Sequence, residues 1–146
     1  MAEILARRTQ LKVKQAQQGD TLRAGMVYIA PPDQHLLVNP DGTLTLSRSE
    51  LVHFLRPSAD LLFESTAAYY KDRAIAVVLT GTGSDGSMGV QAIKKMGGTV
   101  IIEDPSTAQF AGMPEAALAT KTVDFQLKGD EIGSALVSLV TGSDTP

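Results

Sequence analysis

One acidic side chain in a glycine-rich loop has the setting of a catalytic group. The loop GTGSDG, residues 81–86, follows an uncharged apolar run at 74–80 and precedes a segment with helical spacing, so Asp85 lies just past the end of a predicted strand. In parallel α/β sheets, ligands and catalytic groups gather beyond the carboxyl ends of the strands. A carboxylate there can hold an imidazole in one tautomer and stabilise the imidazolium formed during acyl transfer. The simpler structural interpretation is that Asp85 caps the helix that begins after it.

The acyl-transfer hypothesis needs a serine and a histidine as well, and the sequence offers no clear pair. Ser84 and Ser87 flank Asp85, but neither has the glycine that the G-x-S-x-G pattern of a nucleophile elbow places two residues before the serine. His35 begins a predicted strand, and His53 lies in the segment before the next helix. Each is more simply explained as a loop or surface histidine than as a general base. Arg56, beside a proline, is expected to be a solvated charge.

The same loop spells a second motif. Gly81, Gly83 and Gly86 form G-x-G-x-x-G between a strand and a helix. Glu103 and Asp104 close the next predicted strand, about twenty residues further on, which completes the pattern of a dinucleotide site. However, the residue before the third glycine is an aspartate, and its charge would oppose a pyrophosphate at the helix N-terminus. Little chain also remains for the second half of such a fold. Nucleotide binding is therefore the weaker alternative.

Hydrophobic patterning places these residues in an α/β fold, and the elements alternate most clearly after residue 57. Predicted strands cover 11–16, 26–30, 36–38, 44–46, 74–80, 99–102 and 123–127, and predicted helices cover 61–69, 87–96, 113–119 and 130–140, the last capped by Asp130. The Asp41-Gly42 turn predicts a hairpin, and the short connections of the first half favour antiparallel pairing. The second half predicts a mostly parallel, doubly wound sheet flanked by helices.

Length and composition limit the possible classes of protein. The 146 residues suffice for one domain with a real core, and the tail 141–146 is expected to fray. The net charge of −3 and the scattered basic residues argue against a nucleic-acid surface. Without cysteine, and with two isolated histidines, thiolate chemistry and a conventional zinc site are excluded. No apolar run is long enough for a membrane span, so we expect no membrane insertion and a cytoplasmic protein.

Four segments together resemble one known family. They are YIAPPDQH, RPSADLLFES, VVLTGTGSDGSMG and EDPSTAQFAGMPEAA, in that order between residues 27 and 117. They are similar to the catalytic domain of the bacterial chemotaxis receptor methylesterases, the protein-glutamate methylesterases. The resemblance implies a serine hydrolase of α/β fold with a mostly parallel doubly wound sheet. It implies hydrolysis of glutamyl methyl esters on chemoreceptors, deamidation of some receptor glutamines in many members, and no metal or organic cofactor.

The resemblance assigns some site residues and leaves others without a counterpart. Asp85 matches the aspartate of the family's Ser-His-Asp triad, Gly81, Gly83 and Gly86 lie in the active-site loop, and the backbone around Thr82 matches the oxyanion region. The family's serine, in an A-S-T-G-G type segment, and its histidine, in a Q-H segment, should both precede residue 1. His35 matches a different histidine of the family. We therefore expect a partial catalytic domain over 1–146 with negligible methylesterase activity alone.

The resemblance also suggests partners in two-component chemotaxis signalling. These are the cytoplasmic domain of a methyl-accepting chemoreceptor, a receiver domain, and an N-terminal chain that supplies the serine and the histidine. A misplaced start codon, a split gene or a degenerate paralogue would each explain a missing first part. The alternative from another class is a non-catalytic module that binds receptor helices or a response regulator.

Overall fold

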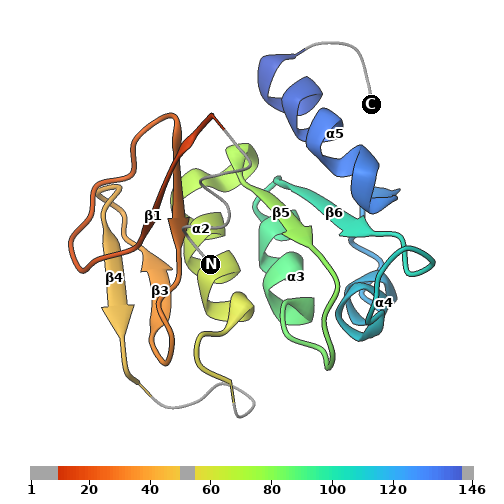
Figure 1. The fold of residues 1–146 in the computed structure, drawn as a ribbon, viewed down its shortest axis with the longest axis horizontal. Coiled ribbons are helices and arrows are strands. Elements are labelled where there is room, and N and C mark those ends of the chain that lie inside the picture. The colour runs from red at the N-terminus through yellow and green to blue at the C-terminus, as the bar shows by residue number, and fades with distance from the viewer. Residues whose placement is uncertain (1–9, 50–54, 143–146) are drawn as a thin grey trace.

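The computed structural model describes residues 10–49 and 55–142, so His53 and residues 143–146 of the predicted tail lie outside the described part. Its elements follow the order expected from the sequence (Figure 1). They are β1 (Lys12–Gln15), β2 (Met26–Ile29), β3 (His35–Val38), β4 (Leu44–Ser47), α2 (Ala59–Tyr70), the 3-10 turn η1 (Lys71–Arg73), β5 (Ile75–Val78), α3 (Ser87–Lys95), β6 (Thr99–Glu103), α4 (Gly112–Ala119), β7 (Phe125–Leu127) and α5 (Gly129–Thr141).

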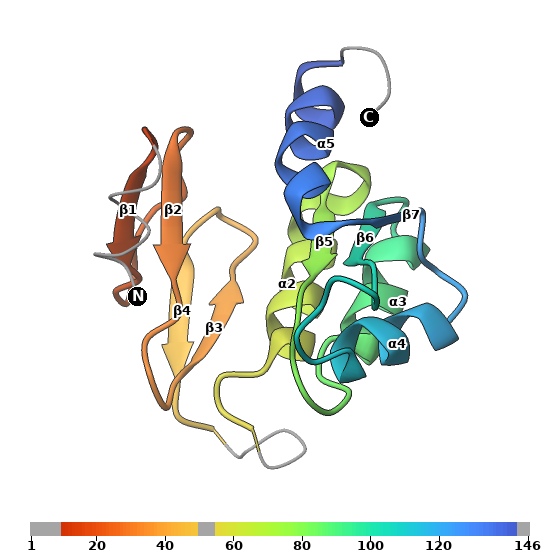
Figure 2. The same cartoon turned by 45° about the vertical axis from the view of Figure 1, so that its right-hand side comes forward.

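The second half forms the predicted parallel sheet. Its strands lie in the order β5-β6-β7, and Ile75 pairs with Thr99 while Ile101 pairs with Phe125, all in parallel. Residues 100–102 of β6, the central strand, are buried, as uncharged β-branched runs covered on both faces should be. Because every strand points the same way, the loops after β5 and β6 meet at one edge of the sheet, where the glycine-rich loop lies (Figure 2).

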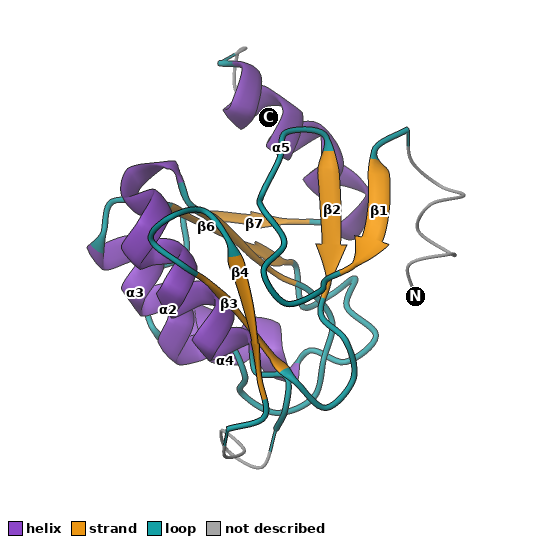
Figure 3. Ribbon diagram, turned by 90° about the vertical axis from the view of Figure 1, so that its left-hand side faces the viewer, coloured by secondary structure: helices purple, strands orange, loops and turns teal. Residues whose placement is uncertain are grey.

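Helices cover this sheet and enclose the larger core. In Figure 3, α2, α3 and α4 lie on one side of the sheet and α5 on the other. The core beneath the first three helices consists of small and branched side chains: Ala67, Ala74, Ala76, Val78, Val90, Ile93, Val100, Ile102 and Ala117. Gly89 of α3 packs so closely on α2 that an added Cβ would lie 2.6 Å from the Phe63 Cβ. The predicted α/β fold with a parallel sheet is confirmed.

The first half is only partly as predicted. The β3–β4 hairpin is antiparallel, with Leu36 opposite Leu46, as the Asp-Gly turn predicts. β1 and β2, however, pair in parallel, with Lys12 opposite Met26, so the expectation of antiparallel pairing throughout this half is wrong. The connection between them does not fold back as a hairpin because it pairs elsewhere. Gly19 donates its amide to the Leu44 carbonyl, and Thr21 bridges to Thr43, which returns the chain to the end where β1 began.

The last helix also begins earlier than predicted. Its N-cap is Lys128, whose amide donates to the Glu131 carboxylate at 3.0 Å, and Asp130 lies within the first turn. Asp130 is therefore not the cap, although its charge still suits the N-terminal end of the helix dipole. The helix runs to Thr141, which the sequence assigned to the frayed tail. No helix among the described residues has the length and apolar character needed to cross a membrane.

Candidate active site

The glycine-rich loop is fastened to α4. Gly81 donates its amide to the Phe110 carbonyl and accepts the Met113 amide, both at 2.9 Å. Gly112 lies so near that an added Cβ would be 3.0 Å from the Gly83 nitrogen and 3.1 Å from the Gly83 oxygen. Gly83 itself has φ +81°, a left-handed conformation that favours glycine. The sequence therefore requires glycine here to turn the chain and to let α4 approach.

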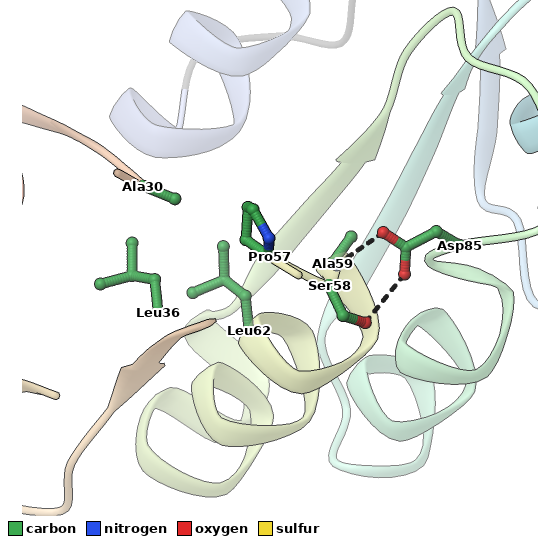
Figure 4. Close-up of a pocket in the computed structure, with 7 residues that line it drawn as sticks. All are labelled: Ala30, Leu36, Pro57, Ser58, Ala59, Leu62 and Asp85. Carbon is green, nitrogen blue, oxygen red and sulfur yellow. Dashed lines mark hydrogen bonds between the residues drawn. The ribbon is translucent and has the colours of Figure 1, made fainter. Parts of the chain in front are cut away.

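Asp85 reaches across to the start of α2. Its carboxylate accepts the Ala59 amide at 2.8 Å and the Ser58 hydroxyl at 3.0 Å (Figure 4). It also accepts the Asp60 amide at 3.2 Å. The helix that follows Asp85, α3, has Gly86 at its N-cap and no side-chain cap there. Asp85 therefore caps a helix, as the simpler interpretation of the sequence predicted. The helix is α2, however, and not α3, which follows Asp85 in the chain.

A carboxylate at the start of α2 likewise binds the first amides of α3. Asp60, in the first turn of α2, accepts the Met88 amide at 3.1 Å and the Gly89 amide at 2.7 Å with its Oδ1 atom. Asp60 is only 4% exposed, so its carboxylate lies inside the protein. Each of these two helices therefore has its first amides bound by a carboxylate from the start of the other, which fixes the loop 81–86 relative to α2.

A serine, a histidine and an aspartate meet here without forming a triad. His35 is fully buried, and its Nδ1 accepts the backbone amide of Ser58 at 3.2 Å. The Ser58 hydroxyl donates to Asp85 and not to His35. The bond between His35 and Ser58 therefore runs to the serine amide and not to its hydroxyl, and Ser58 is only 2% exposed. That His35 is not the general base stays a prediction.

The remaining predicted residues of the loop lie at the surface. Thr82 and Ser84 are exposed, and Ser87 begins α3. The amides of Thr82 and Gly83 donate to no acceptor among the residues that the structure describes. The loop therefore presents neighbouring backbone donors at the edge where Asp85 lies.

The acidic pair that completed the dinucleotide pattern, Glu103 and Asp104, is engaged in local bonds. The Glu103 carboxylate accepts the Thr80 amide and the Thr107 hydroxyl. The Asp104 carboxylate accepts the Ser106 amide at 2.8 Å, which holds the pKa of Asp104 below its ordinary value. Because Asp60 also occupies the amides at the start of α3, the place where a pyrophosphate would bind is already taken by a carboxylate.

A largely apolar pocket opens beside Asp85. Ala30 from the end of β2, Pro57 and Leu62 line it together with Asp85 itself (Figure 4). Arg56 lies in an ion pair with Asp33 at 2.8 Å, so its charge is held by a local partner. A reacting group seated in this pocket would meet one charged acceptor among apolar walls, where hydrogen bonds are stronger than in water.

Sequence reasoning did not single out two residues of this site, Ser58 and Asp60. Both belong to the segment RPSAD, in which a serine follows a proline and stands at a helix N-cap. That signal predicts a cap by the serine itself. Nothing in the sequence says that the partner is a carboxylate 27 residues further along the chain.

The fold and the site together define a class. A carboxylate fixed just beyond a parallel strand, beside a glycine-rich loop and a pocket, lies where α/β domains gather their ligands and catalytic groups. Comparison with known proteins is more specific. The model of the family described as CheB methylesterase matches residues 1–136, and the chain belongs to that family.

Relatives and a solved structure agree with this assignment. A Leptospira interrogans protein assigned as protein-glutamate methylesterase/protein-glutamine glutaminase is 41% identical over 136 residues, which is 93% of this chain and 70% of that protein. Protein-glutamate methylesterase/protein-glutamine glutaminase 2 of Caulobacter vibrioides is 37% identical over 94% of this chain and 41% of its own. The crystal structure of the Thermotoga maritima CheB methylesterase catalytic domain superposes with a TM-score of 0.91 at 37% identity, over 94% of this chain and 75% of that one.

Proposed function

We propose that this chain is the part of a protein-glutamate methylesterase that carries the triad aspartate, Asp85. The enzyme hydrolyses glutamyl methyl esters, and deamidates glutamines, on the cytoplasmic domain of methyl-accepting chemoreceptors. The observation that carries the proposal is the Asp85 carboxylate, which is fixed by donors from α2 and still borders a pocket at the carboxyl end of β5. Such a carboxylate can orient a histidine and stabilise its charged form.

The loop before Asp85 has a second role in this proposal. Acyl transfer needs donors aimed at the oxygen that becomes negative in the tetrahedral intermediate. Thr82 and Gly83 are exposed residues whose amides donate to no described residue, and the bonds of Gly81 to Phe110 and Met113 hold their loop in place. We assign the oxyanion region to the backbone at Thr82 on this basis.

The nucleophilic serine and the histidine come, in this proposal, from a segment outside the 146 residues. Among the described residues, β5 pairs only with β6 and β2 pairs only with β1, so each has a side that can accept another strand. The pocket lies between the end of β2, at Ala30, and Asp85. A segment entering there could bring its side chains to the carboxylate. These 146 residues with that segment are called the complete protein below.

The test is methanol release from methylated chemoreceptor membranes. We expect activity from the complete protein and negligible activity from the 146-residue chain alone, because covalent catalysis needs the nucleophile and the base. Receptor membranes that carry no methyl esters are the control for background release. Activity of the short chain would refute the role given to the outside segment. Inactivity of both would favour the non-catalytic receptor-binding module, which sedimentation of the chain with the same membranes would detect.

A further inference from the structure

We propose that Ser58 is a positioning residue for Asp85, whose hydroxyl selects the carboxylate oxygen that receives the histidine. The inference rests on the proposed function, in which Asp85 orients that histidine. Ser58 is 2% exposed and its hydroxyl is bonded to the carboxylate, so in this proposal it acts on the reaction through Asp85, although it is among the residues that line the pocket. Its effect would pass entirely through Asp85.

The geometry divides the two carboxylate oxygens. Oδ1 accepts both the Ser58 hydroxyl, at 3.0 Å, and the Asp60 amide, at 3.2 Å. Oδ2 accepts only the Ala59 amide, at 2.8 Å, from the protein residues described. An ionised carboxylate offers about four acceptor positions, two on each oxygen. Oδ1 is therefore filled, and the position that remains for an imidazole N–H is on Oδ2.

Capping alone does not explain the hydroxyl. Asp60 caps α3 through the Met88 and Gly89 amides, with no hydroxyl donor among its hydrogen bonds in the described residues. Asp85 receives the corresponding pair of amides from α2 and the Ser58 hydroxyl in addition. The extra donor occurs at the carboxylate that borders the pocket, where the direction of the free acceptor position matters.

The hydroxyl is itself held in place by the fold. His35, fully buried, fixes the Ser58 backbone through its Nδ1 atom, so the N-cap residue cannot rotate away. The other charged groups around this helix start have their own partners. Asp60 binds the start of α3, and Arg56 binds Asp33 together with the carbonyls of residues 48 and 49. Among the described residues, Ser58 is thus the one side chain that donates to Asp85.

The test measures Ser58→Ala in the complete protein. Loss of the hydroxyl leaves the carboxylate less firmly oriented, so we expect kcat to fall about tenfold while KM stays within about twofold. Without the hydroxyl, the Asp85 carboxylate stabilises the imidazolium more strongly, which raises the pKa of the histidine. The acid limb of the kcat/KM profile should therefore move to higher pH by about 0.5. A merely structural serine would not move that limb.

Two variants separate this role from packing. Ser65→Ala removes another hydroxyl of the same helix, one that donates to the Leu62 carbonyl and accepts the Val38 amide away from Asp85, and it should leave the pH profile unchanged. Ser58→Thr adds a methyl group at a buried position but keeps the hydroxyl, and because of that hydroxyl it should retain the wild-type pH profile. It is the variant to measure if Ser58→Ala does not fold.

A wild-type pH profile in Ser58→Ala, or a lower kcat in Ser58→Thr than in Ser58→Ala, would overturn the proposal. An inactive wild-type complete protein would instead contradict the proposed function.

Discussion

Two aspartates perform the same local task in different surroundings. Asp60 and Asp85 each bind the first amides of the other's helix, yet Asp60 is 4% exposed between α2 and α3 whereas Asp85 is half-buried and borders a pocket. A buried carboxylate with its bonds satisfied contributes to stability, while one that keeps an open acceptor position can also act on another group. If the proposed function holds, the comparison teaches that one residue can be both a helix cap and a catalytic carboxylate, depending on what lies on its open side.

Asp85→Asn should give the largest effect. The amide keeps an oxygen for the Ser58 hydroxyl and the Asp60 amide, but it places N–H donors where Oδ2 accepted the Ala59 amide and would accept the histidine, which then adopts the wrong tautomer. In the complete protein we expect kcat to fall about 10⁴-fold. Methanol release from methylated receptors measures it, and thermal unfolding followed by circular dichroism should show a fold that is retained. Near-wild-type turnover would leave Asp85 as a cap like Asp60.

Asp60→Ala should affect stability first. It leaves the part-buried Met88 amide and the buried Gly89 amide without their acceptor, and hydrogen bonds to a charged group are each worth about 1.5–3 kcal/mol. We expect the free energy of unfolding of the complete protein, measured in urea, to fall by about 2–4 kcal/mol. Turnover of the fraction that stays folded should fall much less than in Asp85→Asn. A stable but inactive variant would reverse the contrast between the two aspartates.

Gly112→Ala should give a smaller effect and tests the loop's other anchor. The new methyl group would meet the backbone of Gly83 at 3.0 Å, and backbone cannot move aside as a flexible side chain can. We expect a loss of about 1–3 kcal/mol in unfolding free energy, together with reduced turnover of the complete protein.

Gly133→Ala is the matched control for that substitution. It also places alanine in a helix, but nothing lies within 4 Å of the added Cβ. We expect it to raise the free energy of unfolding by about 0.5–1 kcal/mol. Equal effects of the two substitutions in the urea titration would show that α4 does not hold the loop.

The sequence determined the elements wherever short-range patterns decide them. The uncharged run of β5, the hairpin turn at Asp41-Gly42 and the helical stripe of α3 each predicted the observed element within a few residues. The four family segments likewise marked Asp85 and its loop. These features depend on neighbours in the chain, so the sequence carries them directly.

Tertiary structure decided which elements meet. The parallel pairing of β1 with β2 follows from the bridge of their connection to the strand that begins at Leu44, a contact remote in sequence. The reciprocal caps join residues 25–29 positions apart, and the sequence predicted a cap for α3 from Asp85 because that helix is the nearest in the chain. A carboxylate binds whichever amides the packing brings within 3 Å, and only the close approach of α2 and α3 chose the partner.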